Sequence, residues 1–142
     1  MYLATKAEVD PLTTAVAECF QVSRVIDRSY GDPWIAIWTP ARPLRLLNLA
    51  STWTLRAGDN QALCAGDRRI AKQWGRAIYE QIEPLDGLQW PSSVLGAGLA
   101  VALYQAAEDV IPARLDLHRP LADPALASAL ARSATAIGYA LA

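Results

Sequence analysis

The sequence has few of the side chains from which most metal and catalytic sites are built. It holds one histidine, His118, and two cysteines, Cys19 and Cys64, in 142 residues. A structural zinc site made of cysteine and histidine takes four ligands, and the sequence has no Cys-x-x-Cys pair. We therefore predict no metal site. A disulfide between the two cysteines stays open, although in a cytoplasmic protein we expect buried free thiols.

The sequence also lacks an excess of either charge and any long apolar run. Thirteen basic and fourteen acidic side chains leave a formal net charge of −1. Binding of nucleic acid or of an acidic membrane surface favours a basic excess, so neither partner is expected. The longest stretch without strongly polar groups, Val94–Tyr104, is shorter than the roughly twenty residues that span a bilayer. No apolar segment typical of a signal peptide follows Lys6, and we predict a cytoplasmic protein.

What the sequence does have is ample material for a core. Hydrophobic residues make up 53% of it, including five tryptophans and five tyrosines. A chain of this length and composition is expected to fold as one domain over residues 1–142. No internal repeat or linker is visible. Strands and helices mix without a strict strand–helix–strand rhythm, which predicts an α+β fold: a single compact domain with a mixed β-sheet flanked by helices.

Local signals predict the main elements. Strands are expected at residues 1–5, 34–38, 44–49, 88–90 and 115–118. Helices are expected to start at Asp10-Pro11, at Asp67 (ending near Ile82) and at Asp123-Pro124. Aspartate is a favoured N-cap and proline suits the first helical position. Residues 96–104 are apolar throughout, and periodicity leaves open a buried strand or the start of a helix.

The first predicted helix has one apolar face and one notable carboxylate. The residues expected to face the core follow helical spacing: Leu12, Ala15, Val16, Cys19 and Phe20. Glu18 lies about 130° from the middle of that stripe, at 100° per residue, and so points away from it. By local pattern alone Glu18 is a solvated helix carboxylate. Ser92 and Ser93 directly follow a predicted strand, where they either cap the next segment or belong to a site.

Common catalytic motifs are not met. Gly96-Ala-Gly98 begins like a dinucleotide-binding loop, but Val101 stands where the third glycine belongs. Ser92, His118 and Asp116 could be assembled into a hydrolase triad, but one histidine with arbitrary partners is not specific. Four basic side chains share one side of the helix after Asp67, and we expect a solvated face there: Arg68, Arg69, Lys72 and Arg76.

Two separate segments resemble a known family. Residues 75–104 include a helix, Asp86-Gly87, a short apolar-aromatic strand, Pro91-Ser92-Ser93 and an apolar segment. Residues 2–4, Tyr-Leu-Ala, precede a helix that carries Glu18. In this order the segments resemble RES domains, bacterial toxins named for an Arg, a Glu and a Ser. The resemblance covers roughly residues 1–117.

The resemblance implies a fold like that of ADP-ribosyltransferases and a reaction that consumes NAD+ as substrate, with no cofactor. The bond between nicotinamide and ribose would be cleaved by hydrolysis or phosphorolysis, or ADP-ribose would pass to a protein. Carried over by position, Glu18 and Ser92 are the catalytic residues, while Tyr2 and Ser93 bind substrate, Ser93 replacing Ser92 if the register shifts by one. Glu18 would stabilise positive charge on the ribose, Ser92 would bind the nicotinamide amide or a ribose hydroxyl, and Tyr2 would contact the same end. A cognate antitoxin protein is the implied partner, and a homo-oligomer is possible.

The sequence departs from the family pattern at the arginine. That arginine precedes the Tyr-x-Ala strand, whereas Arg24 and Arg28 of this chain follow Glu18. The resemblance is therefore to a RES domain without the segment that carries the family Arg. Two functions stay open: an NAD+-consuming toxin domain, and a catalytically degenerate RES-like domain that binds a partner, for which the basic face beyond Asp67 is a candidate surface.

Overall fold

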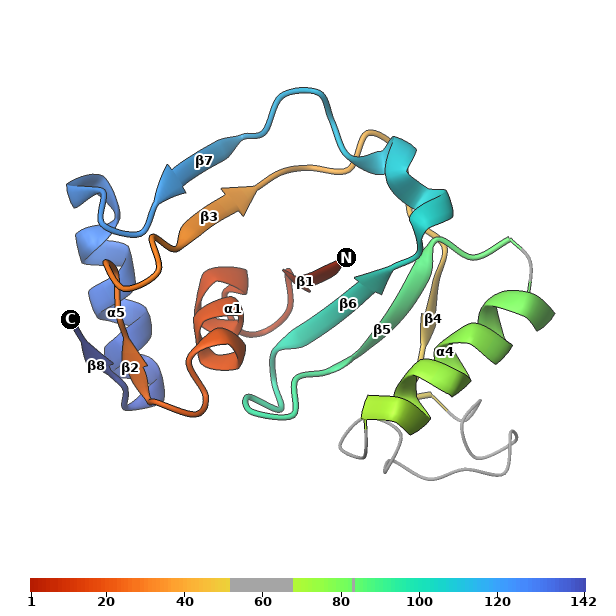
Figure 1. The fold of residues 1–142 in the computed structure, drawn as a ribbon, viewed down its shortest axis with the longest axis horizontal. Coiled ribbons are helices and arrows are strands. Elements are labelled where there is room, and N and C mark those ends of the chain that lie inside the picture. Colours follow the sequence, from red (N-terminus) through yellow and green to blue (C-terminus); the bar gives the residue numbers. More distant parts are fainter. Residues whose placement is uncertain (52–67, 83) are drawn as a thin grey trace.

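A four-stranded mixed sheet lies at the centre of the fold (Figure 1). The computed structural model describes residues 1–51, 68–82 and 84–142. The strand order is β1-β6-β5-β4, with β1 (Tyr2–Thr5), β6 (Leu99–Leu103), β5 (Gly87–Pro91) and β4 (Leu46–Asn48). Within this four-stranded sheet, β4 and β5 pair in parallel, and the other neighbouring strands are antiparallel. The predicted α+β class with a mixed sheet and helices is confirmed.

The register of the sheet follows from the central strand, β6. Tyr2 pairs with Ala102 on one side of β6, and Trp90 pairs with Ala100 on the other. Paired residues of antiparallel strands point to the same face. Two alanines on β6 therefore separate the rings of Tyr2 and Trp90 without filling the space between them.

Helices and short strand pairs complete the molecule (Figure 1). The α-helices are α1 (Pro11–Cys19), α4 (Arg68–Gln81) and α5 (Ala127–Ile137); two 3-10 helices are η1 (Gln105–Val110) and η2 (Pro124–Leu126). Two small sheets are formed by β2 (Val25–Ile26) with β8 (Ala140–Leu141), in parallel, and by β3 (Trp34–Ile37) with β7 (Leu117–Pro120), antiparallel. Helix α1 packs against α5 and against strands β1 and β6. None of the helices in the described ranges is long and apolar enough to cross a membrane.

Three apolar clusters hold these elements together. The first joins α1, β2 and α5 through Val16, Ile26 and Leu130. The second joins β6 and η1 through Val101 and Val110. In the third, helix α4 packs on the sheet, with Ile78 against Leu49 and Leu88. The first cluster fixes α1, and hence Glu18, to the C-terminal part of the chain.

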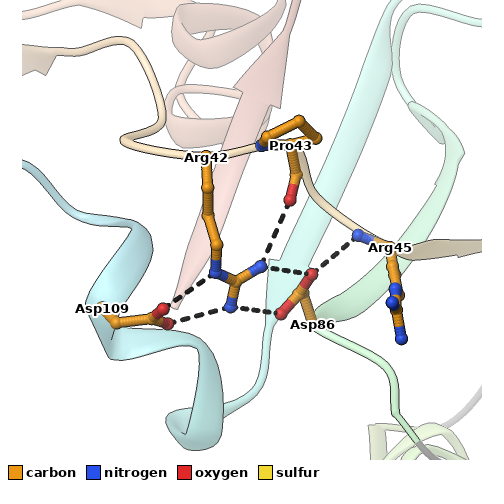
Figure 2. Close-up of polar contacts among 5 residues, drawn as sticks. All are labelled: Arg42, Pro43, Arg45, Asp86 and Asp109. Atoms are coloured by element: carbon orange, nitrogen blue, oxygen red, sulfur yellow. Dashed lines mark hydrogen bonds and ion pairs between the residues drawn. The ribbon is translucent and has the colours of Figure 1, made fainter.

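An ion-pair network ties the segment before β4 to the turn before β5 and to η1 (Figure 2). The guanidinium of Arg42 donates to both oxygens of Asp86 and of Asp109, and to the carbonyl of Pro43. Asp86 also accepts the backbone N–H of Arg45, at 2.7 Å. The pKa values of both carboxyl groups are lowered, first by their hydrogen bonds to Arg42. All N–H groups of this guanidinium are used within the protein, so the network is structural.

The buried face expected for the first helix needs correction. The buried face of α1 is rotated from the predicted stripe: Thr13, Thr14, Val16 and Ala17 are buried, while Cys19 is an exposed free thiol. The two threonine hydroxyls are satisfied, one by Ser133 of α5 at 2.9 Å and one by the carbonyl of Asp10. Hydrogen-bonded hydroxyls can be buried at little cost. A pattern that counts only apolar residues therefore predicts the wrong buried face for α1.

The remaining expected elements are mostly found. Asp10 caps α1 by accepting the N–H of Thr13 at 3.1 Å, and Pro11 is its first residue. Asp123 caps η2, which leads into α5. The apolar segment at 96–104 is a strand, β6, and the short helix that follows it, η1, is a 3-10 helix. The expected helix start at Asp67 and the cysteine Cys64 lie outside the described residues.

Candidate functional site

Glu18 sits in the last turn of α1, where the helix meets the connection between β5 and β6. Glu18 lies one helical turn after Thr14, which faces Gly98 in that connection, so the Glu18 side chain reaches the same connection. The carboxylate accepts a short hydrogen bond from the Ser92 hydroxyl, 74 residues away in the sequence. Figure 1 shows α1 beside this end of β5 and β6. The contact joins two of the residues that the resemblance selects.

Ser92 is almost completely enclosed, with 3% of its surface exposed. Its hydroxyl donates to Glu18 and accepts the backbone N–H groups of Val94, at 3.2 Å, and of Leu95, at 3.0 Å. The serine therefore does cap the turn that follows, and it also fixes the direction of the Glu18 carboxylate. Its own hydrogen-bonding capacity is used within the protein.

Tyr2 approaches the same carboxylate from β1. Burial, followed by the negative charge of Glu18 and a polar contact with it, raises the pKa of the Tyr2 phenol to about 12. The phenol is protonated at neutral pH and lies close to the Glu18 carboxylate. Tyr2 as a residue is 52% exposed, and its ring centroid lies 5.8 Å from that of Trp90, with the two rings tilted. Tyr2 and Trp90 form an open aromatic surface beside Glu18.

A close backbone approach sets the distance between α1 and the β5–β6 connection. Gly98 faces Thr14, and a Cβ at position 98 would lie 2.4 Å from the Thr14 hydroxyl oxygen and 2.8 Å from its methyl carbon. Gly98 also accepts the N–H of Ser92 at 2.8 Å. The glycine lets the helix come near enough for Glu18 to meet Ser92.

Other predicted residues do not join this group. Ser93 is exposed, and its hydroxyl makes no hydrogen bond within the described part of the chain. His118 lies on β7 and packs against Trp34, with ring centroids 4.8 Å apart. Among the described residues no hydrogen bond links His118 to Ser92 or Ser93, and Asp116 accepts from Thr39 instead. The hydrolase triad is therefore not assembled.

The basic face of α4 is partly neutralised. Arg76 forms an ion pair with Glu80 at 2.7 Å, four residues along the helix, and its side chain is 83% exposed. The side chain of Arg68 lies outside the description. The expected solvated face fits the exposed positions of Arg76, Lys72 and Arg69.

The structure adds residues that the sequence did not single out. Trp90 completes the aromatic surface. The alternation of side chains along β5 places Trp90 on the same face of the sheet as Tyr2, and this alternation is the sequence feature that could have identified it. In the sequence, Gly98 stands out only as part of Gly96-Ala-Gly98, the start of a dinucleotide-binding pattern that Val101 breaks. Within the described ranges, no cluster of three or more His, Cys, Asp or Glu side chains is placed to hold a metal ion.

The comparisons with known proteins bring no relative to this site. No protein-family model matches the chain, and no curated protein or solved structure matches it significantly. The functional interpretation therefore depends on the geometry of Tyr2, Glu18 and Ser92 and on the chemistry of these side chains.

Proposed function

We propose that this protein is a RES-type domain that cleaves the bond between nicotinamide and ribose in NAD+. The observation that carries the proposal is the meeting of Glu18, Ser92 and Tyr2, which come from a helix, a turn and an edge strand. Glu18 and Ser92 are 74 residues apart in the sequence, so their proximity is a product of the tertiary fold. Their arrangement, a fixed carboxylate beside an exposed aromatic surface, suits a cationic, planar leaving group.

The chemistry follows from the charge that develops during the reaction. The C–N bond breaks with its electron pair moving to the pyridinium nitrogen, so neutral nicotinamide leaves and positive charge builds on the ribose. A carboxylate held beside that ribose stabilises the charge. Water or phosphate then forms the new C–O bond; with water, one proton is released to solvent. The products are nicotinamide and ADP-ribose, or ADP-ribose carrying a phosphate.

Each side chain has a role that its contacts support. Glu18 stabilises the ribose cation and orients the incoming water or phosphate. Ser92 holds the Glu18 carboxylate in one direction, a positioning role that its enclosed hydroxyl suits better than contact with substrate. Tyr2 offers its half-exposed ring to the nicotinamide end. In this proposal a cognate antitoxin would inhibit the domain by covering the same cluster.

The proposal is tested by NAD+ turnover. Purified protein is incubated with NAD+, with and without phosphate, and nicotinamide release is followed for wild type, Glu18→Gln and Glu108→Gln. Glu108, on η1, has an exposed carboxylate without a hydrogen bond in the described structure, so it is the matched control. We expect Glu18→Gln to lower kcat by about 100-fold or more, as loss of an electrostatic stabiliser does. Dependence on phosphate separates phosphorolysis from hydrolysis.

Failure of this test supports the other function. If wild type releases no nicotinamide, the partner-binding interpretation, in which the domain is catalytically degenerate, gains support. If Glu18→Gln turns over NAD+ as fast as Glu108→Gln does, the role of Glu18 is refuted.

A further inference from the structure

A pocket of about 350 Å³ lies beside the Glu18 cluster. Its walls come from the end of α1, the turn after Ser92 and the end of α5, and its lining includes Ala17, Arg24, Val94, Leu95, Gly138 and Tyr139. Ala17 directly precedes Glu18. The N–H groups of Val94 and Leu95 bind the hydroxyl that holds Glu18. Pocket and cluster therefore share two structural elements, and the volume is within the roughly 300–1,000 Å³ of small-molecule sites.

Arg24 is the charged residue of this lining. Its guanidinium makes no hydrogen bond or ion pair with any part of the chain that the structure describes. The other lining side chains are apolar apart from the Tyr139 hydroxyl, which contacts the Ala17 carbonyl at 3.4 Å. A cation whose donors are unused, next to apolar walls, favours an anionic ligand.

The backbone at Arg24 adds an independent observation. Arg24 has φ +52°, in the left-handed region that favours glycine. It is held there because its N–H donates to the Phe20 carbonyl at 2.8 Å and its carbonyl accepts the N–H of Ala140 at 3.0 Å. The end of α5, across the same pocket, has the same left-handed conformation at Gly138, with φ +69°. Arg24 thus holds a long charged side chain at a backbone position where glycine is the easier residue.

We propose that this pocket binds the phosphate groups of a nucleotide, with Arg24 as their donor. The inference rests on the proposed function in one respect: it places the diphosphate half of NAD+ in the pocket, and the nicotinamide end at Glu18 and Tyr2. A guanidinium donates two parallel hydrogen bonds to a phosphate. In this proposal Arg24, which follows Glu18 in the sequence, is the phosphate-binding arginine.

The test measures binding without turnover. ADP and adenosine are titrated by calorimetry into wild type, Arg24→Gln and Arg114→Gln, all as the full chain. Arg114 is exposed, lies between η1 and β7 away from the pocket, and loses the same charge. We expect ADP to bind wild type and Arg114→Gln equally, and Arg24→Gln about 10- to 100-fold more weakly, the effect of losing charge-assisted hydrogen bonds. Adenosine lacks phosphate, so its affinity should be the same for the three proteins.

A second variant guards against a folding artefact. Arg24→Gly removes the side chain and suits the left-handed backbone, so its thermal midpoint should equal or exceed that of wild type while ADP binding falls as in Arg24→Gln. Equal ADP affinity in wild type and both Arg24 variants, or no ADP binding by wild type, overturns the inference.

The two proposals fail in distinguishable ways. Arg24-dependent ADP binding without any release of nicotinamide from NAD+ supports the pocket and refutes only the chemistry at Glu18. If Arg24→Gln cleaves NAD+ with an unchanged KM, the claim that the pocket binds phosphate is refuted. The proposed function then stays in place.

Discussion

Replacing Gly98 by alanine should separate the two halves of the candidate site. The added Cβ would meet the Thr14 oxygen at 2.4 Å, the Thr14 methyl carbon at 2.8 Å and the Leu95 carbonyl oxygen at 3.1 Å. Thr14 is completely buried, so its side chain has no free space to move into. We expect helix α1 to shift away from the β5–β6 connection, and Glu18 to lose its fixed contact with Ser92.

The size of the effect follows from overpacking a buried contact, which costs about 1–3 kcal/mol of unfolding free energy. For a chain of this length the thermal midpoint should fall by about 3–10 °C. Nicotinamide release should fall further than the folded fraction does, because the cluster is displaced even in the folded protein. Thermal unfolding by circular dichroism and the turnover assay, both run well below the midpoint, measure the two effects.

Two comparisons make the reasoning refutable. Gly96→Ala is the matched control, because a Cβ there meets nothing within 4 Å and φ is not positive, so stability should be unchanged or slightly raised. Thr14→Ala removes both clashing atoms, so the cost of Gly98→Ala should shrink by about 1 kcal/mol in that background. Equal stability of Gly98→Ala and Gly96→Ala, or additive losses in the double variant, would show that the approach is not tight.

Two further predictions follow from shifted pKa values. The lowered pKa values of Asp86 and Asp109 stabilise the fold above the ordinary carboxyl pKa of about 4, and this stability is lost as pH falls through the folded pKa values. Arg42→Gln should therefore flatten the decline of the urea midpoint below about pH 5, and an unchanged pH profile would contradict this. Cys19 is exposed as a residue, but neighbouring atoms partly cover its sulfur, and this burial, followed by the charge of Glu18, raises the pKa of the thiol. Glu18→Gln should therefore speed alkylation of Cys19 at pH 8, measured by peptide mass spectrometry. An unaltered rate would place Glu18 away from that thiol.

Local signals predicted the elements whose cause is local. Asp10 and Pro11 start α1 because a capping carboxylate and a preset φ act within one turn. The apolar stripe was misplaced because Thr13 and Thr14 are buried through hydrogen bonds, which a hydropathy pattern cannot register. Strands β2 and β8 are two residues long, too short to show any period.

Features that depend on distant segments could be predicted only in part. The strand at Leu99–Leu103 is decided by its pairing with β1 and β5, and an apolar run alone fits helix and strand equally. The resemblance selected Tyr2, Glu18 and Ser92, and the structure brings them together. The pairing of Tyr2 with Trp90, and the place of Arg24 in a pocket formed partly by α5, depend on tertiary packing that no local pattern contains.

The most direct measurement is the initial rate of nicotinamide release from NAD+ by wild type and by Glu18→Gln, side by side at equal folded concentration. We expect steady release by wild type and a rate lower by about 100-fold or more for the variant. Equal rates for the two proteins, or no release by wild type with or without phosphate, would contradict the claim that Glu18 is the centre of an NAD+-cleaving site.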